Sequence, residues 1–127
     1  MTESCTIILE LPNRCLSPNN PPGTMRGRMR KAMATKRYRR LSREATQEEG
    51  IESGPWELAS CFAVFYHKQK RRRDDVNHLA MLKPAYDGMV EARLLEDDDS
   101  EHLKTLTPEF RIDRQFPRVE LTITREE

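Results

Sequence analysis

Hydrophobic and polar residues follow patterns in the first half of the chain that predict a strand, a loop and a helix. Residues 6–11 (TIILEL) form a β-branched run that Pro12 closes, which is typical of a strand. Residues 13–23 are crowded with proline and asparagine and therefore predict a loop. Residues 25–49 lack proline and consist mainly of good helix formers, so we expect a helix over at least residues 35–48.

The second half of the chain predicts another strand, another helix and two more strands. The aromatic and apolar density of residues 61–66 indicates a largely buried strand. From residue 79 to 94 apolar side chains recur every three or four positions and predict one helical face, which Pro84 must kink or restart. Residues 109–113 and 118–124 alternate in polarity, and a β-hairpin is the economical interpretation.

This order of elements predicts an α+β fold, a small mixed β-sheet packed with helices, in one domain that covers residues 1–127. No apolar stretch approaches the roughly 20 residues that a membrane span needs, and no secretory pattern opens the chain. Three cysteines without a CxxC pair fit a reducing compartment, and Cys61 is expected in the core. The sequence thus predicts a cytoplasmic protein with no membrane partner.

The net charge of +1 hides a separation of 22 basic residues from 21 acidic ones. Nine Lys or Arg and no acid occur between residues 26 and 43, and five more basic residues occur within residues 68–73. These segments predict phosphate binding, with a solvated helix face as the alternative. Only Tyr38 is aromatic there, which favours recognition of DNA shape and backbone over base stacking. The candidate DNA-binding residues are Arg26, Arg28, Arg30, Lys31, Lys36, Arg37, Arg39, Arg40, Lys70, Arg71 and Arg72.

Two acidic clusters stand beside these cations. Asp74 and Asp75 directly follow the second basic run, and residues 96–99 follow the predicted helix. Taken singly, they are explained by ion pairs, a helix N-cap or a solvated acidic loop. Together they provide oxygen ligands for Mg²⁺ and cations for a phosphate backbone, which metal-dependent phosphodiester cleavage requires.

Residues 73–99 (RDDVNHLAMLKPAYDGMVEARLLEDDD) resemble the core signature of the RusA-like Holliday junction resolvases. That signature has an Arg-Asp-x-Asp-Asn element, a helix bearing Lys and Asp-Gly, and an Asp-Asp pair. The opening LPNRCLSPNN and the closing RVELTIT fit the same family. By this resemblance Asp74 matches the first family aspartate, Asp98 looks like the third and Lys83 matches the essential lysine. Arg73 precedes the first acid, while Asn77 and Asp97 support the motif.

The resemblance implies a homodimeric endonuclease that resolves four-way junctions and related branched DNA by paired symmetric nicks, in recombination and repair. It implies Mg²⁺, or alternatively Mn²⁺, as cofactor, no nucleotide cofactor, and a phage or prophage origin as the favoured source. The expected metal ligands are Asp74, Asp75 and Asp98, with Lys83 and Arg73 as further catalytic residues. The ordinary alternative for Lys83 is an i,i+4 ion pair with Asp87.

The chain departs from the family pattern at one position, because Val76 stands where the second aspartate belongs. Asp75 can substitute if it lies in a loop, where its carboxylate can swing toward the same ion. Otherwise the chain is a branched-DNA-binding protein with weakened catalysis. The histidines, His67, His78 and His102, lack zinc-ligand spacing and are interpreted as surface or capping residues.

The distance between the two acidic clusters raises a further question. A helix of about 15 residues is roughly 22 Å long, and the acids lie at its two ends. Either the break at Pro84 shortens the path and the loop after Leu95 folds back, or a dimer partner supplies acids across the two-fold axis.

Overall fold

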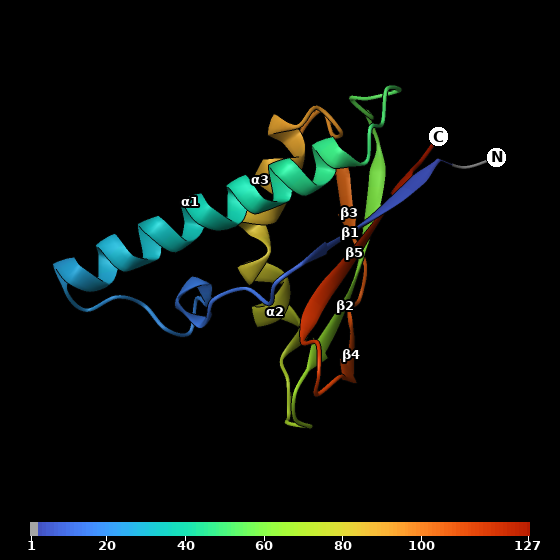
Figure 1. The fold of residues 1–127 in the computed structure, drawn as a ribbon. Coiled ribbons are helices and arrows are strands. Elements are labelled where there is room, and N and C mark those ends of the chain that lie inside the picture. The colour runs from blue at the N-terminus through green and yellow to red at the C-terminus, as the bar shows by residue number, and fades with distance from the viewer. Residues whose placement is uncertain (1–2) are drawn as a thin grey trace.

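The computed structural model describes residues 3–127, and a mixed five-stranded sheet organises them (Figure 1). Its path is β1-β5-β2-β3, with β4 also paired to β2. β5 is antiparallel to both β1 and β2, while β3 and β4 run parallel to β2 along its other edge. The strands are β1 (Ser4–Leu9), β2 (Ala59–His67), β3 (Leu103–Thr105), β4 (Glu109–Ile112) and β5 (Arg118–Arg125).

The helices all lie to one side of this sheet (Figure 1). They are the short 3₁₀ helix η1 (Arg14–Leu16) and the α-helices α1 (Met25–Glu48), α2 (Asp75–Met81) and α3 (Lys83–Glu91). Alternate residues of β1 and β5 are buried, and the side chains of Phe65, Met89 and Leu121 lie fully inside. The prediction of a single small α+β domain with helices packed on a mixed sheet is therefore confirmed.

The predicted hairpin of the last two strands is wrong. β4 and β5 lie on opposite sides of β2, where Val64 pairs with Glu109 on one side and with Glu120 on the other. The link between them passes the end of β2, because the Asp113 amide donates to the His67 carbonyl over 2.9 Å. Alternation of polarity specifies which side chains face the core, but two strands that flank a third alternate just as a hairpin does.

Pro84 restarts the helix, as predicted. α2 ends at Met81, Leu82 caps it, and α3 begins at Lys83 with Pro84 in its first turn. Pro84 is tolerated there because the first turn of a helix does not need its missing N–H. Two short helices thus replace one continuous helix of 15 residues. Within residues 3–127 the structure contains no helix long and apolar enough to cross a bilayer.

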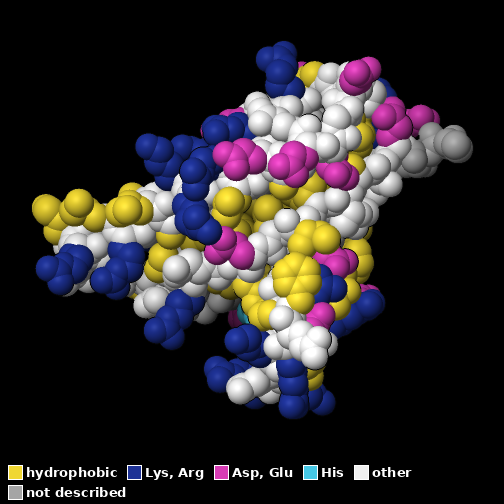
Figure 2. Space-filling view, in the orientation of Figure 1, with side chains coloured by type: hydrophobic (Ala, Val, Ile, Leu, Met, Phe, Trp, Pro, Cys, Tyr) yellow, Lys and Arg dark blue, Asp and Glu magenta, His cyan; other side chains and the backbone are white. Residues whose placement is uncertain are grey.

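α1 is longer than its predicted minimum, and its first turns project beyond the body of the protein (Figure 1). Thr24 caps it by accepting a hydrogen bond from the Gly27 amide over 3.0 Å. Met25, Met29 and Met33 are exposed at 68%, 62% and 71%, and Figure 2 shows hydrophobic and basic side chains side by side on this projecting end.

The other half of α1 crosses α3 at very short range. The Ser42 hydroxyl donates to the Ala85 carbonyl over 2.7 Å, and Gly88 faces the same crossing. A Cβ atom on Gly88 would lie 2.4 Å from the Arg39 carbonyl oxygen, so this position has room only for glycine. The crossing fixes α3, and with it Lys83, relative to the basic helix.

Candidate active site and nucleic-acid surface

Lys83, the first residue of α3, joins two of the acids that the sequence separates. Its Nζ donates to Asp87 Oδ1 over 2.8 Å and to Asp98 Oδ2 over 2.5 Å. The loop after Leu95 therefore folds back to the start of α3. The Asp98 side chain is only 11% exposed, while that of Lys83 is 62% exposed. The ion pair with Asp87 and the contact with Asp98 exist together. The interpretation of Lys83 as a helix ion-pair partner therefore does not exclude its interpretation as a catalytic residue.

The charge of Lys83 is secured by its partners. Burial alone would lower the pKa of Lys83, but the hydrogen bonds to Asp87 and Asp98 outweigh it, and the pKa is raised. The lysine is thus a cation at neutral pH. An exposed ammonium held beside a largely buried carboxylate is a group that can contact a phosphate.

Asp74 and Asp75 lie at the start of α2. Asp74 is the N-cap, and its Oδ1 accepts from the Asn77 amide over 3.1 Å. Asp75 is the first residue of α2. It was expected to take the place of the aspartate missing at position 76 only if it lay in a loop. Neighbouring helical residues point about 100° apart around the axis, so the Asp75 side chain does not point where a side chain at position 76 points. Val76 itself is 77% exposed, so an aspartate there would stand in solvent.

Asn77 anchors the proline-rich loop to α2. Its Oδ1 accepts a hydrogen bond from the Ser17 hydroxyl over 2.7 Å, and the Asn19 amide donates to the same hydroxyl over 3.1 Å. Ser17 is buried despite lying in a loop. The segment LSPNN is therefore held against the start of the helix that carries Asp74 and Asp75.

The predicted metal ligands fit a hard cation in their chemistry, but one chain does not gather them. Carboxylate oxygens are the ligands that Mg²⁺ prefers. Among residues 3–127 just one trio of candidate ligand atoms lies within 4.8 Å of one another, and it belongs to Asp97, Asp99 and His102. Asp74, Asp75 and Asp98 form no such trio. The exposed trio is explained by its own hydrogen bond, 2.6 Å between His102 Nδ1 and Asp99 Oδ1.

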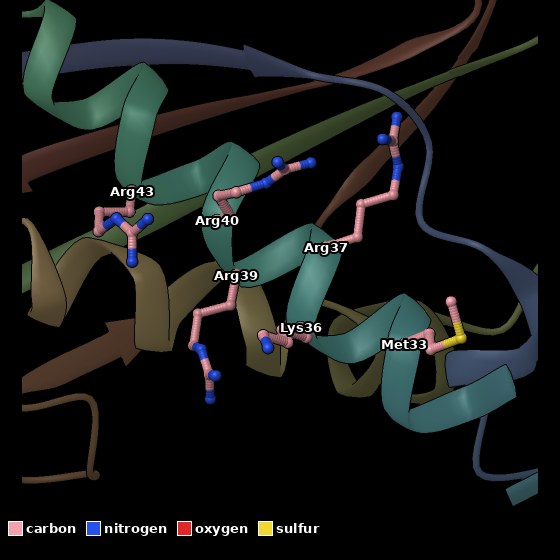
Figure 3. A pocket seen from close by; sticks show the side chains of 6 residues that line it. All are labelled: Met33, Lys36, Arg37, Arg39, Arg40 and Arg43. Carbon is pink, nitrogen blue, oxygen red and sulfur yellow. The ribbon is translucent and has the colours of Figure 1, made fainter. Parts of the chain in front are cut away.

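The predicted DNA-binding residues of α1 divide into paired and unpaired cations. Arg37 lies 2.6 Å from Glu10, and Arg39 lies 3.2 Å from Glu91. Lys36, Arg37, Arg39 and Arg40 are among the residues that line a hollow of about 420 Å³. Their side chains leave α1 in different directions (Figure 3). Within the described part of the chain, six of these cations have no acidic partner within 4 Å: Arg26, Arg28, Arg30, Lys31, Lys36 and Arg40. Tyr38 is buried and donates to the Glu10 carbonyl, so it is not available for stacking.

The second basic segment forms the loop between β2 and α2, at the opposite end of the sheet from the chain termini (Figure 1). Lys70, Arg71 and Arg72 are exposed in it. Arg73 folds inward, and its Nη2 donates to the Gln69 carbonyl over 3.0 Å. Burial lowers the pKa of Arg73, and the positive charge of Arg71 lowers it further. Both side chains line one pocket beside this loop.

The interpretation of His78 as a surface or capping residue is wrong, and His67 is half-buried. His78 is 7% exposed, and its Nδ1 donates to the Asp74 carbonyl over 2.9 Å. The two imidazoles meet edge to face at 5.4 Å, and both pack against Phe65 and Phe110. Sequence reasoning missed this cluster, although His67 has the same strand parity as buried Phe65 on β2. His102 is half-buried in a turn where the Asp99 carboxylate accepts a hydrogen bond from its amide and contacts its Nδ1.

The histidine cluster predicts loss of stability in acid. Burial, with the positive charge of Arg73 and His78 as further causes, lowers the pKa of His67 from 6.5 to about 4. Between these values the unfolded chain binds the proton and the folded one does not, so the free energy of unfolding falls as the pH drops. We expect His67→Phe to reduce this loss by about 1 kcal/mol in urea unfolding at pH 7 and about pH 4.5.

His102→Gln is the matched control for this experiment. The hydrogen bond with Asp99 raises the pKa of His102. Protonation of His102 therefore favours the folded state as the pH falls, which is opposite to the effect of His67. Replacing His102 should not flatten the pH dependence of the free energy of unfolding. An unchanged pH dependence in the His67→Phe protein would show that the buried imidazole does not control it.

Comparison of the chain with protein-family models gives no match, and comparison with curated proteins gives none either.

Proposed function

We propose that this chain is a RusA-like Holliday junction resolvase, a metal-dependent endonuclease that makes paired symmetric nicks in four-way or related branched DNA. The observation that carries the proposal is the contact of Lys83 with Asp98, 15 residues away in sequence. The family signature contains a lysine and a distant acid, and here these two residues meet in the fold. The basic surfaces on α1 and on the β2–α2 loop supply the cations that a DNA backbone requires.

Each group has a role that follows from its place. The Lys83 ammonium neutralises charge that develops on a phosphate during cleavage. Asp98 orients Lys83. The carboxylates of Asp74, Asp75 and Asp98 together would hold Mg²⁺ or Mn²⁺. When bound, such an ion supplies Lewis-acid polarisation of the phosphate and a water of lowered pKa. Arg73 contributes positive charge directly before Asp74.

The second part of the proposal is a homodimer. A four-way junction needs two opposed nicks, and a two-fold symmetric dimer provides two identical sites in that relation. A partner subunit would also bring a second set of acids, which matters because one chain does not gather the three predicted ligands.

A second candidate function is branched-DNA binding without efficient cutting. It is favoured by Val76, which is exposed at the position of the second family aspartate, and by the helical position of Asp75. In this case the basic surfaces bind the junction and the carboxylates no longer hold an effective ion.

The test is incubation of the purified protein with a synthetic four-way junction in Mg²⁺, Mn²⁺ or EDTA. Resolvase activity predicts symmetric nicks with either ion, none in EDTA, and none from Asp74→Asn. Asp99→Asn is the matched acidic control, and we expect it to cut. Junction binding without cutting in any metal supports the binding module, and absence of both binding and cutting rejects both functions.

Restoring the family residue should improve the site. We expect Val76→Asp to raise the rate of junction cleavage about tenfold or more, because it adds an oxygen ligand next to Asp74 at a position with room in solvent. The measurement is single-turnover cleavage as a function of Mg²⁺ concentration, with Val76→Asn as the uncharged control. An equal rate for Val76→Asp and its parent would mean that position 76 plays no part in metal binding.

Paired and unpaired arginines of α1 should differ in their contribution to DNA binding. We expect Arg40→Gln to reduce the slope of log affinity against log salt concentration by about 1, because Arg40 is available for a phosphate. Arg37→Gln should change the slope less, since Glu10 already neutralises Arg37 at 2.6 Å. Equal changes in both slopes, measured by fluorescence anisotropy on one junction, would show that DNA displaces Glu10.

A further inference from the structure

A pocket of about 320 Å³ lies between the β2–α2 loop and β4. One wall carries the cations Lys70, Arg71 and Arg73 from the loop. The other wall carries Phe110, Ile112 and Arg111 from β4, with His67 between the two walls. Cations on one wall and apolar side chains on the other fit a ligand that has both a charged and an apolar part.

The cations of this pocket have no acid to neutralise them, apart from Arg111, which lies 2.6 Å from Glu109. Arg71 donates to the neutral Gln69 side chain over 3.2 Å, and Arg73 donates to a backbone carbonyl. Within residues 3–127 neither guanidinium has a carboxylate within 4 Å. Two guanidinium groups that line one pocket without a carboxylate partner form a site for an anion, and arginine suits phosphate because its donors are arranged as a fork.

The apolar wall continues an aromatic stack of the core. Phe65 and His67 both stack with Phe110, at centroid distances of 5.6 Å and 6.3 Å. Phe65 is fully buried, whereas Phe110 and His67 line the pocket and Ile112 is 50% exposed. His67 also leaves its Nε2 buried without a hydrogen-bond partner. The pocket side of this wall, formed by Phe110 and Ile112, matches the flat face of a heteroaromatic ring.

We propose that this pocket binds one nucleotide of a nucleic-acid strand, with its base against Phe110 and Ile112 and its phosphate at Arg71 and Arg73. The inference rests on the proposed function, because it names a subsite beside the candidate active site. The connection is His78, whose ring contacts both His67 and Phe110 while its Nδ1 donates to the carbonyl of Asp74. His78 therefore lies between this pocket and the backbone of Asp74, the first predicted metal ligand.

The experiment measures binding of fluorescein-labelled hexathymidylate to the full chain by fluorescence anisotropy. We expect Phe110→Leu, Ile112→Ala and Arg71→Gln each to weaken binding at least fivefold, since a base–side-chain stacking contact contributes about that much or more. Ile8→Ala and Arg114→Gln are the matched controls, because Ile8 is 51% exposed on β1 and Arg114 is exposed outside the pocket. Both controls should bind within about twofold of the parent.

Three competitors distinguish the ligand. An abasic hexamer should bind at least fivefold more weakly than hexathymidylate, and inorganic phosphate and a hexaglutamate peptide should displace it poorly. Equal binding of the abasic strand, or equal binding of hexaglutamate, would overturn the nucleotide subsite in favour of a general anion surface. Unchanged binding by all three pocket variants would overturn it as well.

Junction cleavage by the same proteins separates this inference from the proposed function. A parent that cuts junctions while its pocket variants bind hexathymidylate normally refutes the subsite alone. A parent that binds hexathymidylate through the pocket but never cuts refutes the enzyme and keeps the subsite.

Discussion

A Lys83→Met protein is expected to cut four-way junctions roughly 10²- to 10³-fold more slowly than its parent, the loss typical of removing one preorganised charge-stabilising group. Methionine keeps the length and the apolar stem of lysine but has no ammonium. The substitution removes the Lys83 ammonium, which lies 2.5 Å from Asp98 Oδ2. The phosphate of a bound junction then loses this cation, and so does Asp98. The measurement is the single-turnover rate on a labelled junction at saturating protein.

Two comparisons show whether the loss is catalytic. Asp87→Asn removes the i,i+4 partner of Lys83 but leaves the contact with Asp98, and such exposed pairs contribute only about 0.2–0.5 kcal/mol to stability. We expect this control to keep cleavage within about tenfold of the parent. Junction affinity should fall little in Lys83→Met, since the proposed DNA surface retains many other cations for the backbone. If both variants lose activity equally, or if Lys83→Met cuts normally, Lys83 acts only as a helix ion pair.

The Gly88→Ala protein is expected to be less stable than its parent by about 1–3 kcal/mol, the usual cost of forcing extra atoms into a well-packed contact. A Cβ at this position would lie 2.4 Å from the Arg39 carbonyl and 2.8 Å from Ser42 Cβ, so α1 and α3 must separate. Backbone atoms cannot rotate away as a flexible side chain can. The measurement is urea unfolding at neutral pH.

Gly23→Ala is the control for a general effect of replacing glycine. No atom lies within 4 Å of a Cβ built on Gly23, so we expect a change within about 1 kcal/mol, in either direction. A Gly88→Ala protein as stable as this control would mean that the two helices approach each other less closely than 2.4 Å implies.

Most secondary structure was predictable because its signals are local. The β-branched run of β1, the aromatic run of β2 and the proline-free composition of α1 each depend on neighbouring residues, and the structure contains all three elements. Pro84 likewise predicted the break between α2 and α3. The three-residue strand β3 was not predicted, because it is too short for any periodicity to appear.

Arrangements between distant segments were the part that the sequence could not predict. Nothing in residues 109–124 indicates that β2 separates β4 from β5, because strand partners are chosen by the packing of the whole sheet. The same holds for the candidate site. Resemblance singled out Lys83 and Asp98 as separate positions, whereas their contact depends on how the loop after Leu95 returns. The pocket between Arg71 and Phe110 joins segments about 40 residues apart, so no local motif could have revealed it.

The position of β5 sets the order in which this chain can fold during its synthesis. β5 lies between β1 and β2, so β1 finds its partner strand only when residues 118–125 have been made. Until then the apolar face of β1 has no sheet to join, and unpaired strands of this kind are prone to aggregate. Closure of β1 onto β5 also joins residues more than a hundred positions apart, and such distant pairing slows folding. A nascent chain arrested before residue 118 should therefore be degraded by proteases, whereas one that has released residue 125 should resist them.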